Sequence, residues 1–227
     1  MSSPQDIMEI TFNVIYLIYI VAIVTLMSKN MQRVKEEDHR ATNRIRWAFV
    51  ALLIGDLGHV GTRLILFFTG ELESNYTLLG IGNLFETIGL LFLFMIYTDA
   101  WRIHFKHPKN WLFYTLIAVG IIGLIIILFP QNQWTGLASP YEWVVIRNTT
   151  WLIQGVALSI LLIRDGRKVN DKKFVRIGIY ILLSFFFYMP VVFFGSAVPM
   201  LGMLMIGGTI IYMLWQYTSY SRFFKKK

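Results

Sequence analysis

The residues with the clearest capacity for chemistry lie within one apolar run, in the segment Gly55-Asp56-Leu57-Gly58-His59-Val60-Gly61-Thr62-Arg63. At about 100° per residue on a helix, Asp56, His59 and Arg63 share one face. An ionised side chain at the centre of a bilayer costs at least about 2.5 kcal/mol on insertion scales, so these groups should face the interior of a helix bundle. A carboxylate and an imidazole one helical turn apart are suited to acid–base catalysis.

Other apolar runs add polar side chains at helical spacing, which predicts that they line the same cavity. They are Glu9 and Asn13 in the first run, Asn83 and Glu86 in the third, Arg147, Asn148 and Gln154 in the fifth, and Tyr188 in the sixth. We expect Asp56, Glu86 and Gln154 to form the floor of this cavity near the middle of the membrane. The other half of the bundle should be apolar and rich in Phe.

This set predicts lipid-directed hydrolysis with Asp56, Glu86 and His59 as the catalytic residues. One of the two carboxyl groups, kept protonated by burial, would donate a proton, while His59 orients water or shuttles protons. Arg63 or Arg147 would hold a headgroup phosphate. The remaining substrate contacts would come from Glu9, Asn13, Asn83, Asn148, Gln154 and Tyr188.

Two other interpretations remain open. The chain could be a proton- or ion-coupled carrier, or a sensor of a small molecule, with rhodopsin-like topology and with the Pro190-containing sixth helix and the glycine-rich seventh helix as its mobile parts. The polar groups could also be purely structural. In that case Asp56 would pair with Arg63, and Glu86 with Arg147, as closed ion pairs that fix the register of the helices.

Several cofactors are disfavoured by the residues themselves. The chain has no cysteine, which excludes disulfides and Cys-based metal sites or nucleophiles. His59 is the one histidine inside an apolar run, so a site with three metal ligands is not expected. No apolar run contains a lysine, which excludes a retinal Schiff base. We therefore expect no cofactor.

Seven long apolar runs must position these groups. They span roughly 7–27, 45–69, 77–98, 111–130, 142–163, 174–195 and 198–218. A helix needs about 20 apolar residues to cross a bilayer, and irregular backbone is not tolerated against lipid. The sequence therefore predicts an all-α integral membrane bundle of seven transmembrane helices, forming a single domain over residues 1–227. We expect a multi-pass protein of the cell membrane.

The basic residues alternate with these runs. Of the 21 Lys and Arg residues, all but Arg63 and Arg147 follow the first, third, fifth or seventh run. The positive-inside rule then places the N-terminus outside the cell and the C-terminus in the cytoplasm. This distribution also indicates contact with anionic lipids rather than with nucleic acid, despite a net charge of +8. The expected partners are membrane lipids and a lipid or small-molecule ligand.

Two family resemblances follow from these motifs. Gly55-Asp56, Arg63 and Gly80-Ile81-Gly82-Asn83 resemble the helix 2–3 pattern of lysoplasmalogenase-type membrane hydrolases, over about a quarter of the chain. Gly55 to Arg63, Arg147-Asn148 and Ser184 to Val192 are similar to an uncharacterised group of prokaryotic seven-helix proteins. That second pattern spans most of the chain but implies no activity. The chain departs from it at Thr62 and at Gly207-Gly208.

Overall fold

The computed structural model describes residues 4–72, 74–137, 139–195 and 197–224, and within them it contains seven α-helices and no strand. The helices are α1 (Pro4–Asn30), α2 (Glu36–Thr69), α3 (Tyr76–His104), α4 (Trp111–Ile126), α5 (Tyr141–Lys168), α6 (Lys172–Phe194) and α7 (Leu204–Phe223). Short 3-10 turns occupy Met31–Arg33, Pro130–Asn132 and Pro199–Met203. Six of the α-helices are long and apolar enough to cross a membrane, whereas α4 is apolar but has 16 residues.

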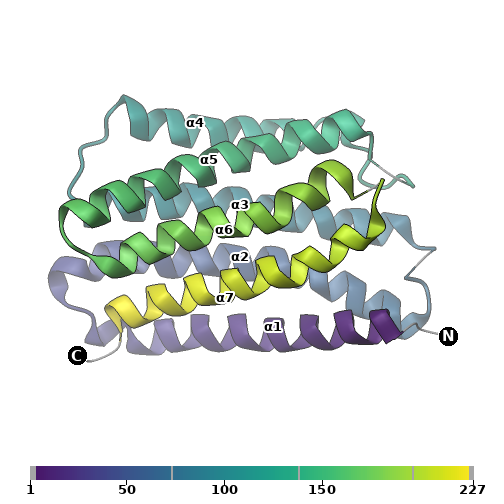
Figure 1. Cartoon of the computed structure of the whole chain (residues 1–227), viewed down its shortest axis with the longest axis horizontal. Coiled ribbons are helices and arrows are strands. Elements are labelled where there is room, and N and C mark those ends of the chain that lie inside the picture. Colours follow the sequence, from purple (N-terminus) through teal and green to yellow (C-terminus); the bar gives the residue numbers. More distant parts are fainter. Residues whose placement is uncertain (1–3, 73, 138, 196, 225–227) are drawn as a thin grey trace.

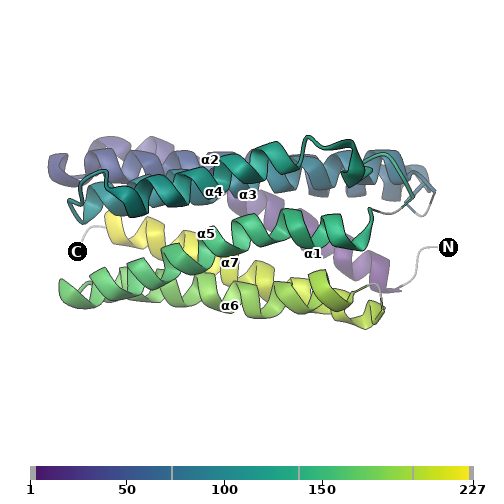
Figure 2. The ribbon, with the colours of Figure 1, turned by 90° about the horizontal axis from the view of Figure 1, so that it is seen from above.

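Consecutive helices run in opposite directions, so that α1 begins at one end of the bundle and α7 finishes at the other (Figure 1). Seen from above, α2, α3 and α4 form one layer and α5, α6 and α7 form a second (Figure 2). Helix α1 closes one side, where it packs on α2 and α7, and the contact of α4 with α5 closes the other side. The result is a multi-pass helical bundle, as the hydropathy pattern predicted.

Several predicted helix boundaries differ from the structure, and α3 and α5 each extend past the end of their apolar run, to His104 and Lys168. The fourth helix ends at Ile126 rather than near residue 130, because a proline at position 130 disfavours helical backbone in the residue before it. The seventh begins at Leu204 rather than at 198, since Pro199–Met203 forms a 3-10 turn that contains Gly202. Helix α2 starts earlier than its apolar run, at an acidic first turn that complements the helix dipole.

Helices α2 and α3 approach most closely at Gly55 and Gly89. A methyl group added to Gly55 would lie 3.0 Å from the Cα atom of Gly89 and 3.0 Å from the carbonyl oxygen of Phe85. These neighbours are backbone atoms, which cannot rotate away. Small residues at this crossing therefore let the two backbones touch, as they do in many membrane proteins.

The half of the bundle nearer the C-terminus of α7 is filled by aromatic rings. Trp215 lies 5.7 Å from Phe49, 6.0 Å from Phe94 and 5.2 Å from Tyr97 between ring centroids. Phe185 continues the stack, at 5.9 Å from Phe94. Rings at these distances and angles attract one another in addition to burying apolar area. This aromatic cluster closes one half of the interior to water, which agrees with the predicted Phe-rich half.

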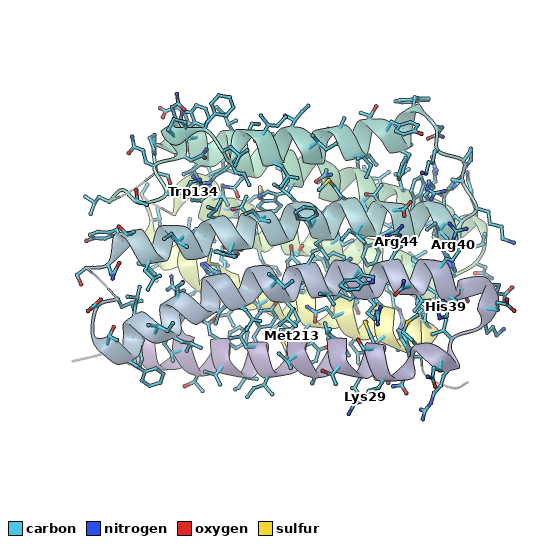
Figure 3. All side chains as sticks on the ribbon, turned by 180° about the vertical axis from the view of Figure 1, so that it is seen from behind. Lys29, His39, Arg40, Arg44, Trp134 and Met213 are labelled. Atoms are coloured by element: carbon cyan, nitrogen blue, oxygen red, sulfur yellow. The ribbon has the colours of Figure 1, made fainter. Side chains whose placement is uncertain are left out.

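Ion pairs cover the same end of the bundle. Asp165 accepts hydrogen bonds from Arg164 (2.8 Å) and from the indole of Trp101 (3.0 Å), and its carboxylate also lies 2.8 Å from His107 Nε2. Figure 3 labels basic residues at this end, with Trp134 at the opposite end: Lys29, His39, Arg40 and Arg44. Lys225–Lys227 lie outside the described residues. The α1–α2, α3–α4 and α5–α6 connections and the end of α7 all lie at this end (Figure 1), so the described members of the four basic stretches gather at one end of the molecule.

The contact at Gly55 makes a testable prediction. Gly55→Ala should lower the free energy of unfolding by about 1–3 kcal/mol, because the added methyl overpacks the α2–α3 crossing. Gly61→Ala is a matched control on the same helix, since its methyl would meet no atom within 4 Å. That control should leave stability unchanged or raise it by up to about 1 kcal/mol through helix propensity. Thermal unfolding in detergent measures both; equal effects of the two substitutions would contradict the tight crossing.

Candidate functional site

A cavity of about 800 Å³ opens in the half of the bundle that the aromatic cluster leaves unfilled. Residues of α1, α2, α3, α5, α6 and α7 line it, together with the turn before α7 and the segment before α5. Ten of the predicted site residues line this cavity: Glu9, Asn13, Asp56, His59, Arg63, Asn83, Glu86, Arg147, Asn148 and Tyr188. The helical spacing thus located most of the lining correctly, because a cavity between helices is built from one face of each.

Asp56 is the acidic residue that α2 contributes to the cavity lining. Its side chain is buried, and its Oδ2 atom accepts a hydrogen bond of 2.5 Å from the Tyr16 hydroxyl of α1. A buried carboxyl group without a partner would cost several kcal/mol, so this hydrogen bond is what allows Asp56 to sit there. The bond also fixes α1 against α2 beside the floor of the cavity.

Glu86 and His59 face each other across the α2–α3 contact. The Oε2 atom of Glu86 lies 3.4 Å from His59 Nδ1, and its Oε1 atom accepts a hydrogen bond of 3.4 Å from the Tyr188 hydroxyl of α6. About one fifth of each side chain of the His59–Glu86 pair is exposed. The pair therefore borders the cavity directly. The two atoms are at ion-pair distance, but His59 Nδ1 forms no hydrogen bond with a described residue, so the attraction between the groups is electrostatic. An imidazole beside a carboxylate can exchange a proton near neutral pH.

The two intramembrane arginines have different surroundings. Arg63 forms an ion pair with Glu9 of α1. Arg147 stacks on Trp134, with its guanidinium carbon 4.3 Å from the ring centroid, and its Nη1 lies 3.4 Å from Asn132 Oδ1. The closed pairs of the structural interpretation, Asp56 with Arg63 and Glu86 with Arg147, are not formed among the described residues.

Gln154 does not belong to the cavity, contrary to the prediction. It is fully buried, and its Nε2 donates a hydrogen bond of 2.8 Å to the carbonyl oxygen of Leu116 in α4. The cavity floor along α5 is reached at Trp151, one turn earlier, and below that level α4 packs against the same face. Gln154 is therefore an interhelical contact.

Asn148 lines the cavity, yet its amide is used within α5. It donates to the carbonyl oxygen of Val144 (2.7 Å) and accepts from the indole of Trp151 (2.9 Å). Both ends of the amide are thereby occupied. Asn148 holds Trp151 at the junction of the cavity and the aromatic cluster.

Sequence reasoning missed the part of the site that comes from the α4–α5 connection. Asn132 is fully buried, and its Nδ2 donates to the carbonyl oxygens of Ile126 (2.7 Å) and Phe129 (3.0 Å). These hydrogen bonds fold the connection back so that the ring of Trp134 stacks against the guanidinium of Arg147. A helical period cannot reveal these residues because they lie in a loop. The methionines of the cavity mouth were missed as well: Met8, Met200, Met203 and Met205.

No protein-family model matches this chain, and neither a curated protein nor a solved structure matches it. Within the described ranges no three His, Asp or Glu side chains gather as a metal site would require. The chemistry that these residues can perform themselves is proton exchange at the His59–Glu86 pair, beside a buried carboxyl group and a buried guanidinium.

The Tyr16–Asp56 hydrogen bond can be tested by a double-mutant cycle. Tyr16→Phe should lower the free energy of unfolding by about 1–3 kcal/mol, since it leaves a buried carboxyl group without its donor. In an Asp56→Asn background the same change should cost less. Tyr180→Phe is the control, because Tyr180 packs against the core and no hydrogen bond of its hydroxyl is seen. Equal costs of Tyr16→Phe in both backgrounds would show that the two groups are not coupled.

Proposed function

We propose that this chain is a seven-span enzyme of the cell membrane that hydrolyses an amphipathic, lipid-derived substrate in its cavity. The observation that carries this proposal is the His59–Glu86 pair on the wall of an 800 Å³ cavity, next to the buried Asp56. Enzyme pockets commonly combine an apolar lining with a few convergent polar groups. The likeness of the α2–α3 motifs to lysoplasmalogenase-type hydrolases supports a lysolipid as substrate.

The proposed reaction uses three side chains. His59 Nε2 takes a proton from water, and the resulting hydroxide attacks the substrate carbon while the bond from that carbon to the leaving oxygen breaks. Asp56 in its neutral form donates a proton to the leaving oxygen. Glu86 orients the imidazole and stabilises its cationic form. Transfer of the proton from His59 to Asp56 then restores the starting state.

The charge distribution supports an orientation with the cavity facing outward. All described Lys and Arg residues other than Arg63 and Arg147 belong to the stretches at the end of the bundle opposite the cavity. By the positive-inside rule that end is cytoplasmic and the N-terminus is outside. The apolar helix α4 is about 24 Å long. Together with the residues that follow it, α4 crosses the membrane as well, which gives seven spans in total. Substrate would then enter from the outer leaflet.

A proton-coupled carrier is the second candidate. It is favoured by the closure of one half of the bundle by the aromatic cluster, next to an open polar half. Pro190 interrupts the hydrogen bonding of α6, and the 3-10 turn at Pro199–Met203 interrupts the start of α7, so both helices can bend at the cavity. Uptake into proteoliposomes that depends on a pH gradient, in the absence of turnover, would select this candidate.

Hydrolysis makes a prediction about turnover. His59→Gln, Glu86→Gln and Asp56→Asn should each lower kcat/KM for a lysolipid by about 10²–10⁴-fold, because His59 and Asp56 transfer protons and Glu86 stabilises the cationic imidazole. The assay follows release of the headgroup or aldehyde from ester- and vinyl-ether-linked lysolipids by purified protein in detergent. Glu71→Gln is the control: this carboxylate lies at the cavity end of the bundle but outside the cavity. Unimpaired turnover in Glu86→Gln would contradict the mechanism.

The proposed orientation can be tested independently of any substrate. Since the chain has no native cysteine, single cysteines can be introduced without background labelling. Ser74→Cys, between α2 and α3, should react with a membrane-impermeant maleimide on intact cells. Lys109→Cys, between α3 and α4, should react only after the membrane is opened. The reverse labelling pattern would show that the chain has the opposite orientation in the membrane.

A further inference from the structure

Arg147 is a buried cation that forms no ion pair with a described carboxylate, and the charge of Glu86 acts on it only at longer range. Its side chain is 8% exposed, and its guanidinium meets the neutral amide oxygen of Asn132 and the ring of Trp134. No described Asp or Glu forms an ion pair with it. The other cation of the cavity, Arg63, is already neutralised by Glu9. The remaining carboxylates are also engaged, Asp56 by Tyr16 and Glu86 by His59 and Tyr188.

We propose that Arg147 binds the oxyanion head of a single-chain amphiphile, which makes an anionic lipid fragment the ligand class of this cavity. The inference rests on the proposed function in that it names the substrate of the same site. A buried guanidinium is costly without a counter-ion, and stacking on an indole offsets only part of that cost. A carboxylate, phosphate or phosphonate oxygen would place an opposite charge in direct contact with the guanidinium, through short, charge-assisted hydrogen bonds.

The surroundings of Arg147 hold it in place before any ligand arrives. Asn132 is fixed by two hydrogen bonds of its own amide, and Trp134 by a bond of 2.9 Å from its indole nitrogen to the carbonyl oxygen of Ile127. Both supports come from the α4–α5 connection, and neither of them lines the cavity. Arg147 also lines the cavity, as do Ser139 and Tyr141, and the Ser139 hydroxyl donates a hydrogen bond of 2.7 Å to the carbonyl oxygen of Asn132. A preorganised cation of this kind suits the recognition of an anion.

The size and apolar lining of the cavity define the rest of the ligand. A volume of about 800 Å³ falls within the range of pockets that hold one drug-sized molecule, which favours one acyl or alkyl chain over two. Met8, Met200, Met203 and Met205 lie among the lining residues, on α1, on the 3-10 turn before α7 and on the first turn of α7. Unbranched thioether side chains adapt to flexible aliphatic chains. The ligand would thus place its head at Arg147 and its chain along these methionines.

A series of probes with one chain length separates the contribution of the head from that of the chain. Decylphosphonate, decanoate and 1-decanol share the chain, and inorganic phosphate has the head alone. In calorimetric titrations of the full-length protein in a maltoside detergent, decylphosphonate and decanoate should bind at least tenfold more tightly than 1-decanol. Inorganic phosphate should bind at least tenfold more weakly than decylphosphonate. If 1-decanol bound as tightly as decylphosphonate, the proposed anion site would be wrong. If inorganic phosphate bound as tightly as decylphosphonate, the proposal that the ligand is an amphiphile would be wrong.

Substitutions then assign the effect to Arg147. Arg147→Gln should weaken binding of decylphosphonate at least tenfold, whereas Arg44→Gln, a control at the opposite end of the bundle, should change it less than threefold. Unchanged affinity in Arg147→Gln, or an equal loss in Arg44→Gln, would overturn the assignment. Should Arg147→Gln fail to fold, Arg147→Lys keeps the charge without the planar fork and should retain the preference for decanoate over decanol at reduced affinity.

The probes contain no bond that the proposed reaction cleaves, so binding and hydrolysis can fail separately. Selective binding of decylphosphonate without turnover of any lysolipid would support the anion site and contradict the proposed hydrolysis. Turnover of lysolipids with no preference for anionic probes would do the opposite.

Discussion

The contact between α2 and α3 at Gly55 and Gly89 is the constraint on which the rest of the site depends. Membrane helices gain little from the hydrophobic effect once they are in lipid, so close backbone packing has to hold them together. At this crossing the two backbones touch, which brings His59 of α2 within 3.4 Å of Glu86 of α3. A larger residue at either glycine would separate the helices and, with them, the two groups that can exchange a proton.

In the half of the bundle away from the aromatic cluster the helices are not all in contact, and the polar cavity occupies the space between them. Three ionisable groups there have a partner from a different helix: Tyr16 for Asp56, Glu9 for Arg63, and Tyr188 for Glu86. These interactions tie α1 and α6 to the α2–α3 pair. They also stabilise charges that would otherwise be expensive at this depth. The same contacts that make the site possible therefore determine where α1 and α6 pack.

The sequence allowed much of the fold to be predicted but less of the site's connectivity. Apolar runs of membrane length and the alternation of basic stretches indicate a helical membrane bundle with its cations at one end. Helical spacing also identifies the faces that line the cavity, because each face is a local property of one helix. Which groups meet is a property of two helices, so the partner of Asp56 could not be read from spacing along α2. Gln154 shows the same limit, since it shares a face with Arg147 but lies where α4 fills the space.

The contrast between the two arginines bears on whether the polar set is structural or functional. A purely structural set would end with every charge matched inside the protein, as Arg63 and Glu9 are matched. Arg147 is held instead by a neutral amide and an aromatic ring, on a wall shared with an acid–base pair. Retaining a buried cation in this way lowers stability unless something outside the chain compensates for it. An anionic ligand is the simplest such compensation, and it would bring its neighbouring bonds within reach of His59 and Glu86.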